Sequence, residues 1–520
     1  MLRMSESQRT KNSRKRNCVQ KLSVSVLALA LLSGCAEVSN NVTSSGSNSA
    51  NWGVVTETQG NTARLTATIP IVWTTGTKVP YRLDSVPWGK ADGKTWTQTN
   101  TFDSVATSQW STSAEFWYSW WFLDAMSIHR WNLKDPRTLS IEDPLLLFNR
   151  FASDSFSYYI PAEYVVDFEQ QLAGESPDSV AGIRYSPFMT DTLTIGDLAP
   201  NGAAKAAGLR RKDRIIAVNG RSAFPVDSAY SWVSDSSKVR LRIFRPSLDS
   251  QFEVTLTRAP ARFPSVWIDT LSGGRGYIGI DQFVSDSDAA YSTGPLVVKA
   301  AQALSGVVAS GGWIILDLRN NPGGSVESVL QSAAALLPKG DSTIRIRSRD
   351  ISEATYGGVI SDTTYMASGS VLSGRKFAVL VNSGTASAAE MLTSAIRSNL
   401  YASGDARLIG QKTFGKGIGQ TTIGTPAGAY LHITSLEILP AGKTHYPSYD
   451  GIGISPDIIN SSALAYALTL TASSSVAGRG TANQQAAGIA ERLQAWNRSQ
   501  TGFVKGGALA YRRLVPKKLR

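Results

Sequence analysis

The sequence contains very little cysteine and histidine, the side chains that enzymes most often use as nucleophiles, general bases or metal ligands. Among 520 residues there are two cysteines, Cys18 and Cys35, and three histidines, His129, His432 and His445. If an N-terminal signal is cleaved and Cys35 is acylated, no free thiol remains, which excludes a cysteine nucleophile, a disulfide and a thiolate metal site. No Asp or Glu pairs with a histidine at ligand spacing, so we expect no metal and no cofactor.

A long apolar run is also missing from the N-terminus. The run Leu22 to Leu32 has eleven residues, whereas a membrane-spanning helix needs about 20. Seven basic residues precede it and Ser33-Gly34-Cys35 follows it, which resembles the lipobox of bacterial lipoproteins. We therefore expect residues 1–34 to be a signal peptide, Cys35 to be lipidated and 35–51 to be a flexible tether. An ordinary signal peptide with an incidental cysteine is the alternative.

The expected location follows from this signal. A lipidated Cys35 anchors the protein in the bacterial cell envelope. Ala36 and Glu37 are not the aspartate that favours inner-membrane retention, so we expect the outer membrane, facing the periplasm. The formal charge of +12 falls to +6 without residues 1–34, and no RNA-binding motif is present, so we expect no nucleic-acid partner.

Tryptophan is concentrated near the N-terminus: nine of the thirteen lie between Trp52 and Trp131. Residues 52–178 are expected to form an α+β region with strands first. Residues 111–131 are expected to form a helix with Trp117, Trp120, Trp121 and Met126 on one face. A buried packing face is favoured over a carbohydrate or partner platform.

Residues 179–260 have the pattern of a separate module. The stretch 195–223, "IGDLAPNGAAKAAGLRRKDRIIAVNGRSA", resembles a PDZ domain of bacterial protease-associated proteins, with Asn219-Gly220 as a hairpin turn. Lys212 stands where such modules often have glycine. By resemblance the module would bind the C-terminus of another polypeptide by strand addition; a structural spacer is the alternative.

Residues 261–470 alternate between apolar strands and helices, which favours helices packed on a largely parallel sheet. Predicted strands include 276–283, 313–321 and 376–382, and a predicted helix covers 296–311. Residues 471–520 are expected to be a helical, basic tail.

A possible nucleophile lies in "VLVNSGTASAAEML", Val379 to Leu392, where a strand passes into a helix. Ser383, Thr385 and Ser387 are the candidates, and a serine needs a base to become nucleophilic. None of the three histidines has a catalytic motif. Lys416, between two glycines in "KTFGKGIGQTT", is the alternative base if burial lowers its pKa, and Gln420 four residues later would orient it.

At this point the sequence resembles the C-terminal processing, or tail-specific, serine proteases. The motifs "GYIGI", "LDLRNNPGG", "TASAAE", "TFGKGIGQ" and "GIGISPDI" occur in the family's order. The resemblance implies Ser387 as nucleophile, Lys416 as base and Gln420 as its partner. The separation of Ser387 and Lys416, 29 residues, is a few residues longer than expected for the family. It also implies an α/β fold: a β/α spiral (ClpP/crotonase-like) protease core with an inserted PDZ-like domain.

An oxyanion hole is the third requirement of such a mechanism. In "RNNPGGSVE", Gly323 and Gly324 follow a buried strand and precede a helix, where free amides favour an anion. The amide of Ala388 is the expected second donor.

The expected function is that of a serine endopeptidase that cleaves unfolded or C-terminal regions of envelope proteins through an acyl-enzyme. The alternatives are a non-catalytic, peptide-binding lipoprotein that keeps the fold, and an esterase that uses Ser387 with His432 or His445.

Overall fold

The computed structural model describes most of the chain from residue 110 to residue 470, and the backbone of five strands before it. Within 110–470 the structure describes all residues except 134–135, 137–138, 175–178, 189–191, 236, 272–273 and 352–357. The five earlier strands are β1 (Val54–Gln59), β2 (Thr62–Ala67), β3 (Lys78–Leu83), β4 (Trp88–Lys90) and β5 (Phe102–Ala106). The signal peptide, Cys35, the tether and the tail from 471 lie outside the described residues.

The Trp-rich helix is α2 (Thr112–Met126), and it is buried on every side rather than along one face. All its residues from Ala114 to Met126 are buried, including Trp117, Trp120 and Trp121. A helix that is apolar all round belongs in a core. Contacts with β3, α3 (Pro144–Phe151), β18 (Ser342–Ile351) and β23 (Tyr430–Pro440) surround it. The predicted single apolar face was therefore wrong, whereas the predicted burial of its tryptophans is confirmed.

Short elements connect this helix to the next module. They are η2 (Arg130–Asn132), β6 (Tyr158–Ile160), η4 (Ala162–Tyr164) and α4 (Val165–Leu172). β6 pairs with β23, so a segment that precedes the PDZ-like module extends a sheet formed mainly by later residues. Gly174 follows α4 with a φ of +68°, as expected of a glycine that ends a helix.

The next module is a small sheet with two helices. Its sheet has the order β13-β12-β10-β9-β8. Its elements are β7 (Ser179–Val180), β8 (Ile183–Tyr185), β9 (Leu193–Leu198), α5 (Ala203–Ala206), β10 (Arg214–Val218), β11 (Arg221–Ser222), α6 (Val226–Asp235), β12 (Lys238–Arg245), η5 (Pro246–Leu248), β13 (Ser250–Thr257) and β14 (Ala259–Pro260). Lys212 has a φ of +70°, which explains why glycine is common at this position in similar modules.

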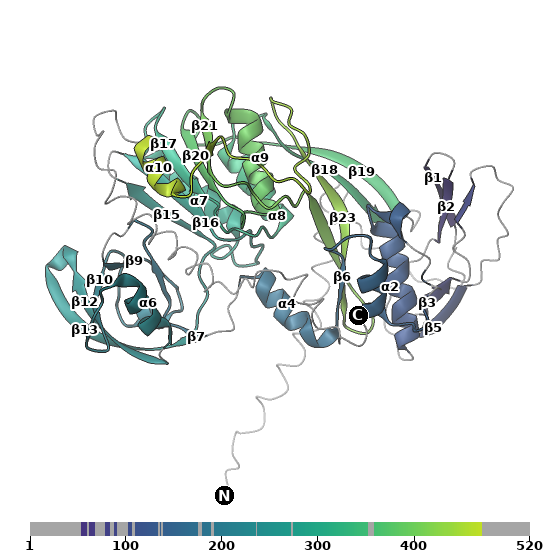
Figure 1. Ribbon diagram of the computed structural model, residues 1–520, viewed down its shortest axis with the longest axis horizontal. Coiled ribbons are helices and arrows are strands. Elements are labelled where there is room, and N and C mark those ends of the chain that lie inside the picture. Colours follow the sequence, from purple (N-terminus) through teal and green to yellow (C-terminus); the bar gives the residue numbers. More distant parts are fainter. Residues whose placement is uncertain are drawn as a thin grey trace, which may run out of the picture. The chain divides into compact units, whose positions relative to one another are not determined.

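The largest part is an α/β unit whose main sheet has the order β15-β16-β17-β20-β21-β24 (Figure 1). All neighbours in it are parallel except the β15–β16 pair. Its elements are β15 (Val266–Leu271), β16 (Arg275–Ile280), α7 (Thr293–Ser305), β17 (Trp313–Asp317), α8 (Val326–Leu336), β20 (Lys376–Val381), α9 (Ala388–Leu400), β21 (Ala406–Gly410), β24 (Ile458–Ile459) and α10 (Ala463–Leu470). The sequence therefore predicted this α/β unit correctly.

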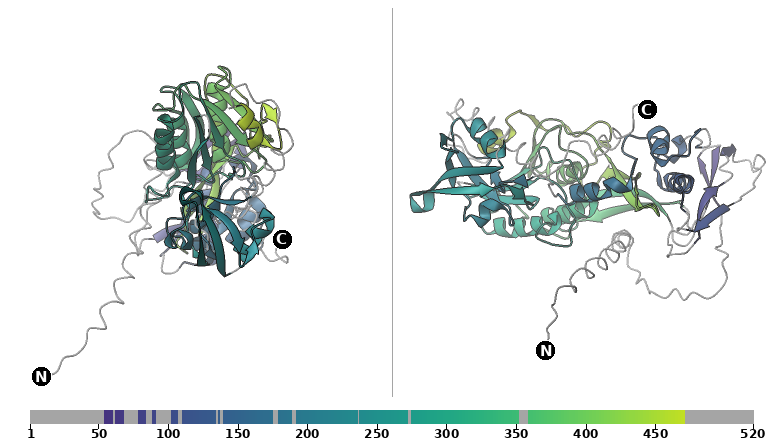
Figure 2. Two further views of the ribbon diagram at one scale, coloured as in Figure 1. Left: turned by 90° about the vertical axis from the view of Figure 1, so that its left-hand side faces the viewer. Right: turned by 90° about the horizontal axis from the view of Figure 1, so that it is seen from below.

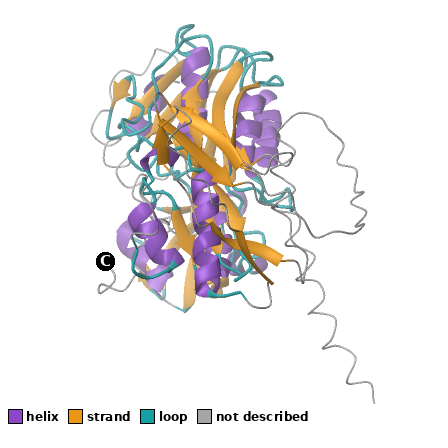
Figure 3. Ribbon diagram, turned by 90° about the vertical axis from the view of Figure 1, so that its right-hand side faces the viewer, coloured by secondary structure: helices purple, strands orange, loops and turns teal. Residues whose placement is uncertain are grey.

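Two separate apolar clusters lie on the two faces of this sheet. Side chains of α7, α8 and α9 form one cluster with alternate residues of the strands, such as Leu316 and Val379. α10 forms the other with their neighbours, such as Ile315 and Leu380. The helices beside the strands are seen in Figure 2 and, as purple ribbons beside orange strands, in Figure 3. Because both faces are covered, the strands contain nearly continuous apolar runs.

A second, antiparallel sheet has the order β19-β18-β23-β22, with β6 also paired to β23. Its other strands are β19 (Gly358–Met366) and β22 (Ile418–Gly424). β22 and β23 pair so that Gln420 lies opposite Thr434 and Thr422 lies opposite His432. This register places these four polar side chains beside the loop that contains Lys416.

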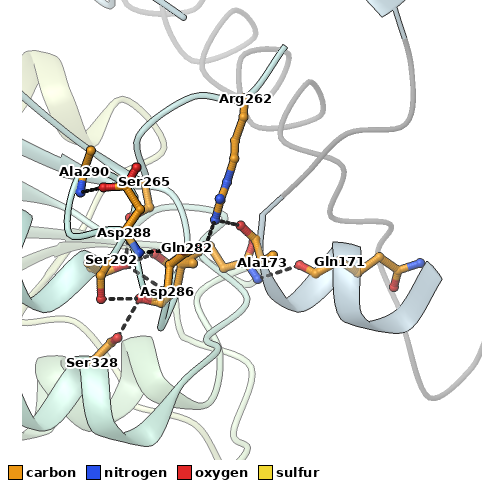
Figure 4. Close-up of polar contacts among 12 residues, drawn as sticks. Gln171, Ala173, Arg262, Ser265, Gln282, Asp286, Asp288, Ala290, Ser292 and Ser328 are labelled. Atoms are coloured by element: carbon orange, nitrogen blue, oxygen red, sulfur yellow. Dashed lines mark hydrogen bonds and ion pairs between the residues drawn. The ribbon is translucent and has the colours of Figure 1, made fainter. Parts of the chain in front are cut away.

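The segments that lead into and out of the small module are tied to a loop that follows β16. Arg262 forms an ion pair with Asp286 at 2.7 Å and donates to the carbonyl of Ala173. Gln282 donates to the carbonyl of Gln171 at 3.1 Å (Figure 4). Incoming and outgoing segments therefore meet on this loop.

Candidate active site

The turn between β20 and α9 singles out one of its three hydroxyl residues. Thr385 is buried and its hydroxyl donates to the carbonyl of Leu318 at 2.8 Å, so it holds the turn together. Ser383 is exposed. Ser387 is the residue immediately before α9 and has φ +53° and ψ −120°. Positive φ is uncommon in residues other than glycine and is typical of strained functional positions.

The buried carboxylate of Glu390 connects Ser387 to the loop that contains Lys416. Glu390 Oε2 accepts from the backbone amides of Ser387 at 2.9 Å and Lys416 at 2.7 Å. Oε1 accepts from Thr413 Oγ1 at 2.5 Å and the amide of Gly415 at 2.7 Å. Burial raises the pKa of Glu390, and these hydrogen bonds oppose the rise. One carboxylate thus brings together two residues that lie 29 positions apart.

The motif "TASAAE" contains Glu390, but the sequence alone suggested no role for it. A signal was present, because serine followed three residues later by glutamate is the capping-box pattern that opens a helix.

Lys416 lies just before β22, and its amino group is in an environment that favours the neutral form. Nζ donates to Gln420 Oε1 at 2.8 Å and lies 4.9 Å from the centre of the Phe156 ring. Burial lowers the pKa of Lys416 to about 8, although Asp154 and Glu390 act in the opposite direction. Lysine and glutamine are thus brought together, as the sequence predicted.

No hydrogen bond in the described part of the protein joins Lys416 Nζ to Ser387 Oγ. The amino group is instead directed to Gln420. Catalytic hydrogen bonds are often long before substrate binds, and they tighten in the complex.

The glycine pair of "NPGG" lies against the serine. A Cβ atom on Gly323 would lie 2.7 Å from Ser387 Cβ and 2.9 Å from the amide nitrogen of Ala388. Gly324 is bridged to Phe283. The amide of Gly323 donates to Asn321 Oδ1 at 2.9 Å. Within the described residues the amides of Gly324 and Ala388 have no backbone acceptor.

Among the described residues, the geometry therefore offers two of the three predicted amides to an anion, those of Gly324 and Ala388. The third, the amide of Gly323, is occupied by Asn321. The backbone of Gly323 approaches Ser387 and Ala388 closely, and any larger residue at this position would prevent that approach.

The three histidines are placed differently. His432 is in β23, where Nδ1 bonds to Thr422 Oγ1 at 2.8 Å and the ring lies beside Tyr158 and Phe168. Burial and the nearby Lys416 lower its pKa to about 3. His129 precedes η2, and His445 is exposed in a loop. No hydrogen bond among the described residues connects a histidine to Ser387, so the geometry gives the esterase alternative no support.

Two family models match the protein. One, described as peptidase family S41, matches residues 274–460, and the other, described as PDZ domain, matches residues 171–243. The first therefore covers Ser387 and Lys416 together with every strand of the main sheet except β15, and the second covers most of the small module.

Curated relatives agree with these matches. A "Carboxyl-terminal-processing protease" from Picosynechococcus is 27% identical over 362 residues, covering 67% of this protein and 80% of the relative. A "Probable CtpA-like serine protease" from Staphylococcus aureus is 30% identical over 311 residues, covering 59% of this protein and 57% of the relative. Among solved structures, the photosystem II D1 C-terminal processing protease is 23% identical with a TM-score of 0.39, covering 68% of this protein and 93% of that one.

The α/β unit and its site thus define a serine peptidase that carries a PDZ domain. Residues 274–460 thus form a peptidase family S41 domain, and the curated proteins to which the chain is similar include carboxyl-terminal-processing proteases.

Proposed function

We propose that the protein is an endopeptidase in which Ser387 is the nucleophile and Lys416 is the general base, with Gln420 orienting the lysine. The observation that carries the proposal is Glu390 Oε2, which binds the amides of both residues and so fixes the nucleophile and the base in one place. The lowered pKa of Lys416 supports it, because an amine with a pKa of about 8 is partly neutral near pH 7.

The reaction has two halves. Lys416 takes the proton of Ser387 Oγ as the oxygen attacks the peptide carbonyl, and the amides of Gly324 and Ala388 hold the oxyanion. The lysine ammonium then protonates the leaving nitrogen, the C–N bond breaks, and an acyl-enzyme remains. In the second half Lys416 takes a proton from water as the oxygen of that water attacks the ester carbonyl. The bond to Ser387 Oγ then breaks, the lysine ammonium returns its proton to Oγ, and the released acid loses its own proton to solvent.

The substrates proposed are proteins with unstructured C-termini. A PDZ domain binds such an end as an added strand and holds its carboxylate on backbone amides. The names of the curated relatives refer to carboxyl-terminal processing, which agrees with this choice.

The test is cleavage of an unfolded protein by the enzyme without its signal peptide. Ser387→Ala and Lys416→Ala should each lower kcat/KM by at least about 10²-fold. Lys412→Ala is the matched control, because Lys412 is exposed and lies four residues earlier in the same loop. If Lys416→Ala keeps wild-type activity, the lysine is not the base. Labelling of Ser387 by a serine-reactive probe separates this function from that of a non-catalytic peptide-binding protein.

The pH dependence provides a second test. Only the neutral amine accepts a proton, so kcat/KM should rise with pH and be half-maximal near pH 8, the pKa of Lys416. A half-maximum at about pH 6 to 7 would indicate a histidine base instead.

We further propose that Cys35 is lipidated and anchors the enzyme in the cell envelope, at the outer membrane facing the periplasm. Support comes from the sequence around Cys35. In the described part of the protein, no helix is long and apolar enough to cross a membrane. Incorporation of labelled palmitate in the wild type and its loss in Cys35→Ser would support the anchor, and equal labelling of both would refute it.

A further inference from the structure

A turn outside the matched S41 region reaches the lysine. Residues Asp154 to Ser157 connect α3 to β6. The Asp154 carboxylate closes this turn: Oδ1 accepts from the amides of Phe156 and Ser157, both at 2.7 Å. Its Oδ2 accepts from Ser157 Oγ at 2.8 Å. The same turn places the Phe156 ring beside Lys416 Nζ.

Hydrogen bonds lead from this carboxylate to the lysine. Thr434 Oγ1 donates to Asp154 Oδ1 at 2.9 Å, and Gln420 Nε2 donates to Thr434 Oγ1 at 3.4 Å. Gln420 Oε1 then accepts from Lys416 Nζ at 2.8 Å. Thr434 is fully buried in β23, directly opposite Gln420 in β22.

The direction of each bond follows from the first acceptor. An ionised carboxylate has no hydrogen to donate, so the hydroxyl of Thr434 must give its hydrogen to Asp154. The threonine oxygen is then an acceptor and takes the NH₂ group of Gln420. The oxygen of the Gln420 amide is left to face Lys416, where it accepts from the amine and leaves the nitrogen lone pair free for a proton from serine.

We propose that Asp154 and Thr434 are positioning residues that fix the amide of Gln420 with its oxygen toward Lys416. This inference rests on the proposed role of Lys416 as the base. It assigns to the segment before the PDZ domain a part in the active site. Among the described residues, the charged and titratable groups that interact with Lys416 are Asp154, Glu390 and His432.

Two substitutions separate the hydrogen-bond path from the charge. Thr434→Val has nearly the same shape but no hydroxyl, so Gln420 loses the bond that orients it. We expect kcat to fall roughly tenfold to a hundredfold with KM nearly unchanged, since small displacements of catalytic groups cost this much. The pH of half-maximal kcat/KM should stay near the wild-type value, because Asp154 keeps its charge.

Asp154→Asn does the opposite. Its amide oxygen can still accept from Thr434 and from the turn, but the negative charge that favours the lysine ammonium is lost. The pKa of Lys416 should fall, so the rising limb of kcat/KM should move to lower pH, with a smaller loss of kcat than in Thr434→Val. A purely structural role for Asp154 would reduce the plateau without moving this limb.

The experiment measures pH profiles of kcat and KM for these two variants, with Thr434→Ser as the conservative rescue and Asp362→Asn as an exposed-carboxylate control. The proposal would be supported by three results together: a near-wild-type kcat in Thr434→Ser, a reduced kcat in Thr434→Val, and a rising limb of the kcat/KM pH profile that is shifted only in Asp154→Asn. Wild-type kcat in Thr434→Val, or an unshifted limb in Asp154→Asn, would overturn it. Lys416→Ala is measured alongside. If Lys416→Ala stays active, Lys416 is not the base. If Lys416→Ala is inactive but Thr434→Val and Asp154→Asn behave like the wild type, only the positioning role of Asp154 and Thr434 is refuted.

Discussion

Glu390 provides a sharp test of how the nucleophile and the base are held together. Its two carboxylate oxygens face four hydrogen-bond donors: the amides of Ser387, Gly415 and Lys416 and the hydroxyl of Thr413. Glu390→Gln has almost the same shape, but only one of its two terminal atoms is an acceptor. Whichever way the amide is turned, its NH₂ group meets two donors.

The size of the effect follows from this count. A buried donor left without an acceptor costs about 1–3 kcal/mol, and two are left in Glu390→Gln, partly relieved by movement of the loop. We expect a loss of unfolding free energy on the order of 3 kcal/mol. That is less than the typical net stability of about 5–15 kcal/mol, so the variant should still fold. Its kcat/KM should fall by at least about tenfold, because Ser387 and Lys416 lose their common anchor.

Urea unfolding would measure the stability, and hydrogen exchange of the amides in residues 413–418 and 385–390 would localise the change. Glu327→Gln is the matched control, because Glu327 also lies in the first turn of a helix, α8, but is exposed. Faster exchange in both segments is expected for Glu390→Gln alone. The reasoning is refuted if Glu390→Gln unfolds at the same urea concentration as Glu327→Gln and keeps wild-type exchange.

Two further predictions concern the backbone beside the nucleophile and the joint to the PDZ domain. Gly323→Ala should abolish detectable cleavage, since its Cβ would lie 2.7 Å from Ser387 Cβ. The control is Gly340→Ala, because Gly340 also has positive φ but has open space around it. This control should lose only about 1–3 kcal/mol of unfolding free energy to backbone strain and remain active. Arg184→Leu in β8 should destabilise the protein by about 3–5 kcal/mol, because it removes the buried guanidinium that pairs with buried Asp281 at 2.6 Å and with Asp197 at 3.5 Å. Urea unfolding of both single variants and the double variant with Asp281→Leu should show that the double variant is more stable than the two losses added together; strict additivity would contradict the pairing.

The local pattern of the sequence predicted the joint at Ser387 well. A run of apolar residues, then small ones, then a helical pattern defines β20, the turn and α9 without reference to distant residues. Gln420 was predicted for the same reason, since it follows Lys416 by four residues. These are features that short-range spacing determines.

Features that depend on distant segments were not predictable in the same way. α2 was expected to bury one face, and it buries all of them because strands β18 and β23, more than 200 residues later, close over it. One feature was missed although it is local: the amide of Gly323 is occupied, because the side chain of Asn321, two residues earlier, accepts its hydrogen. Spacing identifies which donors are near, but not which of them are already used.

The base illustrates this limit most clearly. A lysine between two glycines is by itself more often a solvated loop residue than a catalyst. Its pKa in the fold reflects a balance: burial lowers it, and the charges of Asp154 and Glu390 raise it. Asp154 reaches this balance from a turn 280 residues before Thr434, the residue through which it contacts Gln420. The pKa of Lys416 therefore depends on burial and charge contributed by residues far apart in the chain, and substitutions that change either, such as Asp154→Asn, should shift the pH dependence of cleavage even where they touch neither Ser387 nor substrate.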